Sequence, residues 1–132
     1  MREPRWISPR YVMVIHEILL AMDGGGPGVR DRGLLESALD RPRNLFLYES
    51  PDLCRLAASY ITGIVRNHPF VDGNKRTGFM VGATFLEMNG LAFQATELDA
   101  TEHILAVAAG ELGEEQLTRW LRSVTGEADS TI

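Results

Sequence analysis

Cysteine and long apolar runs are both scarce in this sequence. Cys54 is the only cysteine among 132 residues, which excludes an internal disulfide and favours a cytoplasmic protein. No apolar run approaches the roughly 18 to 20 residues that span a membrane, so we expect no membrane association. Positive charge is not in excess, because 18 aspartate and glutamate residues outnumber 13 lysine and arginine residues. The net charge of −5 argues against a general nucleic-acid-binding protein.

The spacing of the apolar residues predicts an all-α fold of about six helices, in a single domain of residues 1–125. We expect residues 126–132 to be a frayed tail. The predicted helices cover about residues 9–22, 32–40, 51–66, 74–88, 97–109 and 114–124. Several of them follow a residue type that caps helix N-termini: Ser8, Asp31, Ser50 and Thr96.

A proline and two short apolar stretches indicate where the chain leaves helical structure between the predicted helices. Arg41-Pro42 is expected to end the second helix, because the residue before a proline disfavours helical geometry. Residues 44–48 then form either a loop or a short strand, and residues 91–94 form a brief extended piece. The third and fourth helices are apolar on several sides, which indicates that they form the centre of the fold.

The polar loop between these two central helices contains most of the chemically active side chains. It reads His68-Pro69-Phe70-Val71-Asp72-Gly73-Asn74-Lys75-Arg76. The first amides of the following helix have no partner within it, and glycine allows a phosphate to approach them closely. Lys75 and Arg76 add positive charge at the same place. We therefore expect a phosphate-binding site at the start of this helix.

The same loop also carries an acid and an imidazole. A carboxylate beside phosphates, such as that of Asp72, is a usual ligand of Mg²⁺. The imidazole of His68 can take a proton from an attacking hydroxyl. Phe70 is expected to point into the core and fix the loop. Together these groups favour phosphoryl-type transfer by direct, in-line attack of a hydroxyl.

This loop resembles the signature of the Fic/Doc (Fido) superfamily, His-x-Phe-x-(Asp/Glu)-(Gly/Ala)-Asn-(Gly/Lys)-Arg. Trp6-Ile7, Gly28-Val29-Arg30-Asp31 and Leu34-Leu35-Glu36-Ser37-Ala38-Leu39 also resemble its death-on-curing (Doc) toxin branch. The resemblance implies a compact Fido-type helical bundle with the motif loop between two central helices. It also implies ATP as donor substrate and Mg²⁺ as cofactor.

The resemblance assigns a role to each motif residue. His68 is the implied catalytic base, and Asp72 is the implied Mg²⁺ ligand. The implied nucleotide- and phosphate-binding residues are Gly73, Asn74, Lys75, Arg76 and Arg66. Of these, Gly73 and Asn74 would shape and line the phosphate cradle, and Lys75 and Arg76 would neutralise phosphates.

Two positions distinguish the Doc branch from the adenylylating Fic branch. Fic-type proteins have Gly and a second Arg where this sequence has Lys75 and Phe79. The Doc branch implies transfer of the γ-phosphate of ATP to a threonine of elongation factor Tu, which blocks translation. Gly73 is the Fic-type residue, so adenylyl transfer to a protein hydroxyl stays an alternative. A catalytically silent Fido binding partner is a third, which the intact His68 and Asp72 argue against.

The Doc branch further implies a toxin that is restrained by a Phd-like antitoxin, whose disordered tail folds on the toxin. Coupled folding of this kind needs an exposed apolar groove. Residues 45–48 offer one part of such a groove, although packing on the core is the simpler interpretation. His16 and His103 have no partners at metal-ligand spacing, so we interpret both as structural or exposed.

Overall fold

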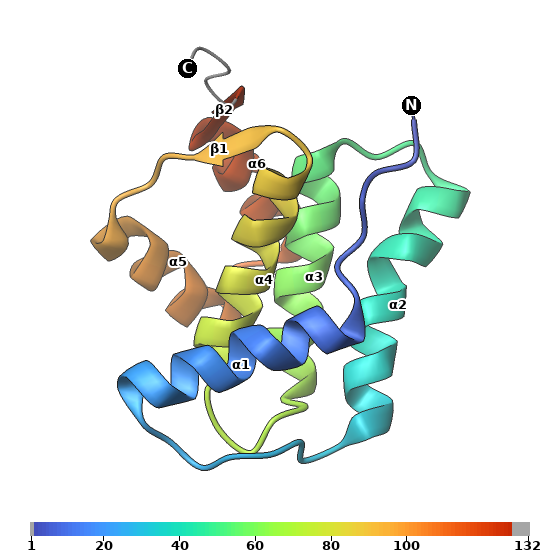
Figure 1. The fold of residues 1–132 in the computed structure, drawn as a ribbon. Coiled ribbons are helices and arrows are strands. Elements are labelled where there is room, and N and C mark those ends of the chain that lie inside the picture. Colours follow the sequence, from blue (N-terminus) through green and yellow to red (C-terminus); the bar gives the residue numbers. More distant parts are fainter. Residues whose placement is uncertain (1, 128–132) are drawn as a thin grey trace, which may run out of the picture.

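The computed structural model describes residues 2–127. Its helices form a bundle around two central antiparallel helices, the third and the fourth in the chain (Figure 1). The helices are α1 (Pro9–Asp23), α2 (Arg32–Tyr48), α3 (Leu53–Asn67), α4 (Asn74–Met88), α5 (Glu97–Ala108) and α6 (Glu114–Ser123). Two short strands, β1 (Leu91–Phe93) and β2 (Thr125–Glu127), pair antiparallel. The prediction of an all-α bundle of about six helices is confirmed.

The core lies around α3, on which four of the other helices pack. Eleven of the fifteen residues of α3 are buried, and α2, α4 and α6 all pack on it (Figure 1). Gly78 and Gly82 of α4 face α3 and leave room for the two backbones to approach. A Cβ at Gly82 would lie 2.5 Å from Cγ1 of Ile61. The apolar sides of the two central helices are therefore joined by direct contact, as their sequences predicted.

The second helix is longer than the sequence predicted. It continues through Arg41-Pro42 to Tyr48, with Pro42 buried inside it. Proline within a helix removes one backbone hydrogen bond and costs about 3 kcal/mol. The following turns offset this cost because Leu45 and Phe46 pack against the core. The prediction that the helix ends at residue 40 was therefore wrong.

Residues 44–48 are helical, so the predicted loop or strand at this place was also wrong. Phe46 packs edge-to-face on the ring of Trp6, with 5.7 Å between the ring centroids. Leu47 and Tyr48 instead project into solvent, with 75% and 86% of their surfaces exposed. Leu45 and Phe46 thus pack on the core, whereas Leu47 and Tyr48 do not.

The expected N-caps Ser8, Asp31 and Thr96 are confirmed, each accepting a hydrogen bond from the backbone N–H three residues on. The third helix differs, because it begins after Asp52 and not after Ser50. The Oδ1 atom of Asp52 accepts a hydrogen bond from the Arg55 amide at 2.9 Å. A carboxylate in this position satisfies one of the first free amides of the helix.

The chain after α6 is ordered further than the sequence indicated. The expected extended piece at residues 91–94 is confirmed as β1. Gly126 pairs with Ala92, and Glu127 pairs with Leu91. The prediction of a frayed tail was therefore wrong for residues 126 and 127, and residues 128–132 lie outside the described part. No helix within residues 2–127 has the length and apolar character needed to cross a membrane.

We predict that Gly82→Ala lowers the free energy of unfolding by about 1 to 3 kcal/mol, because the added methyl overlaps buried Ile61. Denaturant unfolding followed by circular dichroism measures this change. The matched control is Gly33→Ala in α2, whose Cβ meets only an ordinary contact at 3.4 Å and should alter stability by less than about 1 kcal/mol. Equal stability of the two variants would contradict the close packing of α3 and α4.

Candidate active site

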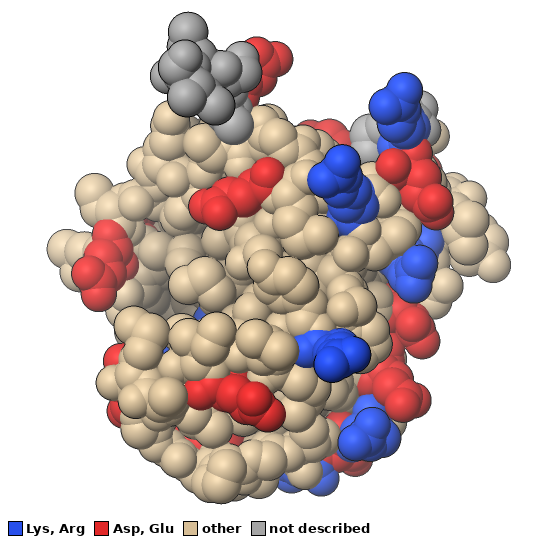
Figure 2. All heavy atoms as spheres, viewed as in Figure 1, with Lys and Arg blue, Asp and Glu red and all other residues tan. Residues whose placement is uncertain are grey.

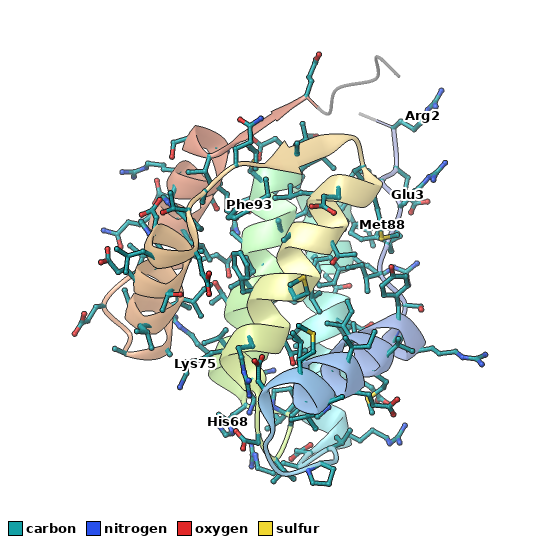
Figure 3. The ribbon with its side chains drawn as sticks, turned by 60° about the vertical axis from the view of Figure 1, so that its left-hand side comes forward. Arg2, Glu3, His68, Lys75, Met88 and Phe93 are labelled. Carbon is teal, nitrogen blue, oxygen red and sulfur yellow. The ribbon has the colours of Figure 1, made fainter. Side chains whose placement is uncertain are left out.

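The motif loop connects the end of α3 to the start of α4, as expected. His68 is the C-cap of α3 and has left-handed backbone geometry, with φ of 53° and ψ of 53°. Its side chain is exposed. Figure 3 shows His68 and Lys75 at the same end of the molecule, beside the first turn of α4. The imidazole is thus free to meet a substrate group from solvent.

Asn74 fixes the loop from inside. Only 4% of its surface is exposed, and its side-chain amide makes two hydrogen bonds to the backbone of Phe70. The Phe70 N–H donates to Asn74 Oδ1 at 2.9 Å, and Asn74 Nδ2 donates to the Phe70 carbonyl at 2.9 Å. Phe70 itself is fully buried, as expected. Asn74 therefore shapes the loop, and its side chain is occupied by this role.

The start of α4 presents free backbone amides. Gly73 is its N-cap, with left-handed geometry (φ 77°) that glycine adopts at little cost. The first helical hydrogen bond runs from the Thr77 amide to the Gly73 carbonyl at 3.0 Å. The amides of residues 74–76 precede this bond and so have no partner within the helix. With the exposed Lys75 beside them, they form a positively polarised helix end.

A cavity of about 530 Å³ opens beside this helix end. Figure 2 shows the surface hollowed between α5 and the rest of the molecule. Its polar rim includes Asp23, Lys75 and Arg76, and its wall is mostly apolar. Phe79 belongs to that wall and packs edge-to-face on Phe93, with 5.2 Å between the centroids. The phenyl ring at this position supplies apolar surface and no charge to the cavity.

Asp72 remains charged because backbone amides surround its exposed carboxylate. The Gly73 N–H donates to Oδ1 at 2.8 Å, and the Gly26 N–H donates to Oδ2 at 3.3 Å. These two hydrogen bonds are the main reason why the pKa of Asp72 lies below its ordinary value, and the charge of Arg76 lowers the pKa further. A cation arriving at this place would therefore meet a full negative charge.

The glycine-rich loop after α1 lies against Asp72, which the sequence did not reveal. A Cβ at Gly25 would lie 2.9 Å from Oδ2 of Asp72, so only glycine allows this approach. Asp23, at the end of α1, forms an ion pair with Arg76 at 2.9 Å. We interpret this loop as a wall of the site. The signal in the sequence was the density of glycines, which by itself indicates only the end of a helix.

His16 supports the loop from below. It is 1% exposed, and its ring stacks on Phe70 with 3.9 Å between centroids and an angle of 11° between the planes. Its Nε2 atom lies 2.9 Å from the Asp72 carbonyl and donates a hydrogen bond to it. His16 is therefore structural, as interpreted, and it lies directly beneath the expected metal ligand.

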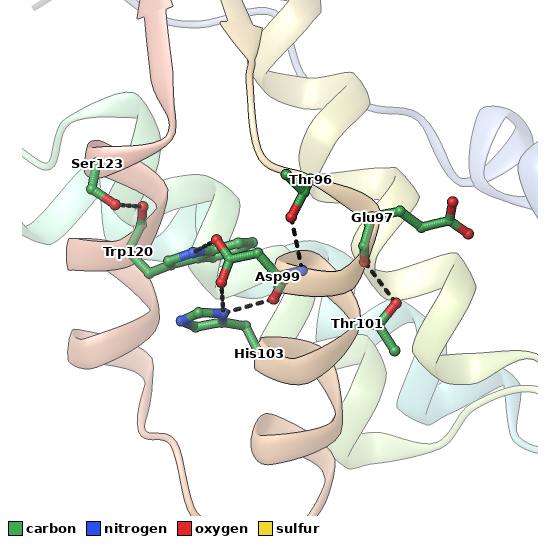
Figure 4. Close-up of polar contacts among 7 residues, drawn as sticks. All are labelled: Thr96, Glu97, Asp99, Thr101, His103, Trp120 and Ser123. Atoms are coloured by element: carbon green, nitrogen blue, oxygen red, sulfur yellow. Dashed lines mark hydrogen bonds and ion pairs between the residues drawn. The ribbon is translucent and has the colours of Figure 1, made fainter.

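His103 is also structural and belongs to a separate cluster between α5 and α6. Its ring stacks on Trp120 at 4.1 Å, and its Nδ1 atom contacts the Asp99 carbonyl at 2.8 Å (Figure 4). The Trp120 indole N–H donates to Asp99 Oδ2 at 2.9 Å. Because α5 also contributes to the cavity, this cluster holds one wall of the cavity in place.

The remaining expected residue, Arg66, lies in the last turn of α3, one residue before its end. Its guanidinium donates to the Leu112 carbonyl at 3.3 Å, in the connection between α5 and α6. Arg66 does not line the cavity, and neither do His68 and Asp72. The first turn of α4 therefore lies between the cavity, which Lys75 and Arg76 line, and the part of the loop that carries His68 and Asp72.

The residues present fit a single Mg²⁺ held partly by a substrate. No group of three or more histidine, cysteine or acidic side chains among residues 2–127 could hold a metal ion alone. Mg²⁺ commonly uses one or two carboxylates and completes its shell with water and phosphate oxygens. The charged, exposed carboxylate of Asp72 suits that arrangement.

We predict that the Asp72 carboxyl titrates below the ordinary aspartate range, because its folded state favours the charged form. The resulting contribution to stability is complete above the unfolded-state pKa. It is lost as the pH falls through the lower folded-state pKa, below about pH 4. Carbon-13 NMR of the side-chain carboxyl during an acid titration measures this pKa directly. A midpoint at or above that of an unstructured aspartate would contradict the hydrogen bonds from Gly26 and Gly73.

Comparison with known proteins places these features in a family. The model of the Fic/DOC family matches residues 6–86. The chain is 32% identical over 127 residues to Protein kinase doc of Escherichia phage P1, covering 95% of this chain and 99% of that protein. It is 39% identical over 85 residues to Toxin Doc of Mycolicibacterium smegmatis, covering 62% of this chain and 65% of that protein. With its helical bundle and motif loop, this chain belongs to the Doc branch of the Fic/Doc family.

Proposed function

We propose that this chain is a Doc-type toxin that transfers the γ-phosphate of ATP to a hydroxyl group of a protein. One juxtaposition carries the proposal: an exposed imidazole and a charged carboxylate lie in the loop that opens into the polarised start of α4. Relatives named as a protein kinase and as a toxin support both halves of the proposal.

His68 is the proposed base. Its imidazole takes the proton of the acceptor hydroxyl while that oxygen attacks the γ-phosphorus in line. A new oxygen–phosphorus bond forms, the bond to the β-phosphate oxygen breaks, and ADP leaves with the bonding electrons. The exposed position of His68 lets a folded protein substrate reach it from solvent.

Asp72 and the start of α4 are proposed to bind the phosphates. Asp72 would hold Mg²⁺, which neutralises charge on the phosphate oxygens when bound. Lys75, Arg76 and the amides of residues 74–76 would bind the oxygens directly. Arg76 is paired with Asp23 in the ligand-free chain, so phosphate binding exchanges one anionic partner for another. The neighbouring cavity has the size of a small-molecule site.

A second candidate function is adenylyl transfer to a serine, threonine or tyrosine hydroxyl. Gly73 favours it, because the Fic-type residue stands at the left-handed N-cap of α4, next to the phosphate-binding amides. Lys75 and Phe79 favour the kinase, since Phe79 offers no charge to a phosphate and faces Phe93. A catalytically silent binding partner is the third possibility, and the same experiment decides among all three.

The proposed partners are those that the resemblance to the Doc branch implies, and toxin relatives support the general expectation of an antitoxin. A threonine of elongation factor Tu is the proposed acceptor, with a block of translation as the consequence. A Phd-like antitoxin is the proposed restraint, and the cytoplasm, which contains both ATP and the translation machinery, is the proposed location. The exposed apolar end of α2, Leu47 and Tyr48, offers apolar surface for such a partner.

The deciding experiment uses ATP labelled at either the α- or the γ-phosphate. The purified chain is incubated with Mg²⁺ and bacterial lysate, and the proteins are separated and scanned for label. We expect label on one protein from γ-labelled ATP only. Label from α-labelled ATP would establish adenylyl transfer instead, and no label from either would favour the silent partner.

We predict that His68→Ala lowers the transfer rate by at least about 100-fold, because the acceptor hydroxyl loses its base. Growth inhibition on expression should disappear with it. Glu102→Ala is the control, since Glu102 is an exposed residue of α5 that lies outside the motif loop and does not line the cavity. The proposed role of His68 would be refuted by a His68→Ala variant that keeps its transfer rate and toxicity.

A further inference from the structure

The motif loop is paired at residues 69–71 with the segment that precedes α2, residues 28–31. Val29 and Phe70 form an antiparallel bridge, and the Val71 amide donates to the Gly28 carbonyl at 3.1 Å. The amide of Arg30 donates to the Pro69 carbonyl at 2.7 Å. This short strand-like pairing fixes the middle of the loop and brings the Arg30 side chain to its beginning.

The guanidinium of Arg30 then binds the two carbonyls that flank the start of the loop. Its Nε atom donates to the His68 carbonyl at 2.7 Å, and its Nη2 atom donates to the Asn67 carbonyl at 3.0 Å. The planar guanidinium offers both donors in one rigid fork, which the single ammonium nitrogen of a lysine lacks. Arg30 thereby fixes the carbonyl groups of Asn67, the last residue of α3, and of His68, its C-cap, relative to one another.

The backbone that Arg30 holds is unusual. Among residues 2–127, His68 is the only non-glycine residue with positive φ. Glycine is the common choice at such a helix end, because a Cβ disfavours left-handed geometry. An imidazole on an exposed loop has few side-chain contacts of its own to aim it. The direction in which it points therefore depends on the backbone conformation of His68.

We propose that Arg30 is a positioning residue that holds His68 in its left-handed conformation and so aims the imidazole at the acceptor hydroxyl. This inference rests on the proposed function, in which His68 is the base. Arg30 acts through the Asn67 and His68 carbonyls.

The test compares Arg30→Met, Arg30→Lys and the control Arg32→Met, which removes the same charge from an exposed site two residues away. We expect Arg30→Met to lower kcat about 10- to 100-fold, with the KM for ATP changed less than about twofold. Arg30→Lys should keep part of the rate, because one donor remains, and Arg32→Met should match the parent chain. Added guanidinium ion, at concentrations that do not denature the protein, should partly restore an Arg30→Ala variant.

A second measurement reports the backbone directly and needs no activity. NMR couplings and chemical shifts of His68 should show loss of positive φ in Arg30→Met and its retention in Arg32→Met. The inference is overturned if positive φ persists in a folded Arg30→Met chain, if kcat is unchanged, or if only KM rises. If Arg30→Met does not fold, the same criteria apply to Arg30→Ala, compared with and without added guanidinium ion. A parent chain without transfer activity refutes the proposed function, whereas the NMR comparison still decides whether Arg30 sets the geometry of His68.

Discussion

The close contact between α3 and α4 is the constraint from which the rest of the structure follows. Gly78 and Gly82 bring α4 so near that side-chain atoms of Ile61 and Val65 fill the space a Cβ would need. Two antiparallel helices at this distance leave only six residues to reverse the chain between them. The chain reverses at once through left-handed His68 and enters α4 through left-handed Gly73. The helix contact thus sets the ends of the motif loop and the direction of the free amides.

Three groups of contacts hold the motif loop in place. Two come from earlier parts of the chain and one comes from the first residue of α4. Asn74 closes it from within, His16 supports it from beneath, and residues 28–31 pair with its outer edge. Most of these contacts are made to backbone atoms of the loop. The imidazole of His68 and the ammonium group of Lys75 therefore remain available, while the backbone that carries them is fixed. A rigid loop with free functional groups is the arrangement that in-line transfer requires.

Electrostatics complete the site in a chain whose net charge is negative. The positive end of α4, Lys75 and Arg76 provide a local field that attracts phosphates. Asp72 is kept anionic by the amides of Gly26 and Gly73, so a cation can join the phosphates at the same place. Asp23 balances Arg76 in the ligand-free chain. Positive and negative groups thus lie close together in one loop and one helix turn. Backbone amides stabilise the charge of Asp72, and Asp23 balances the charge of Arg76.

The sequence by itself determined the helices, most of their caps and the whole motif, because these depend on neighbours within a few residues. It could not determine that α2 continues through Pro42, since the packing of Leu45 and Phe46 that offsets the proline is a long-range contact. Nor could it bring Asp23, Gly26 or Arg30 to the loop, because these residues lie 38 to 53 positions before their partners in the chain. Local patterns therefore specified which chemical groups the protein has. Only the tertiary structure decided how they are held, because the atoms that hold them come from distant parts of the chain.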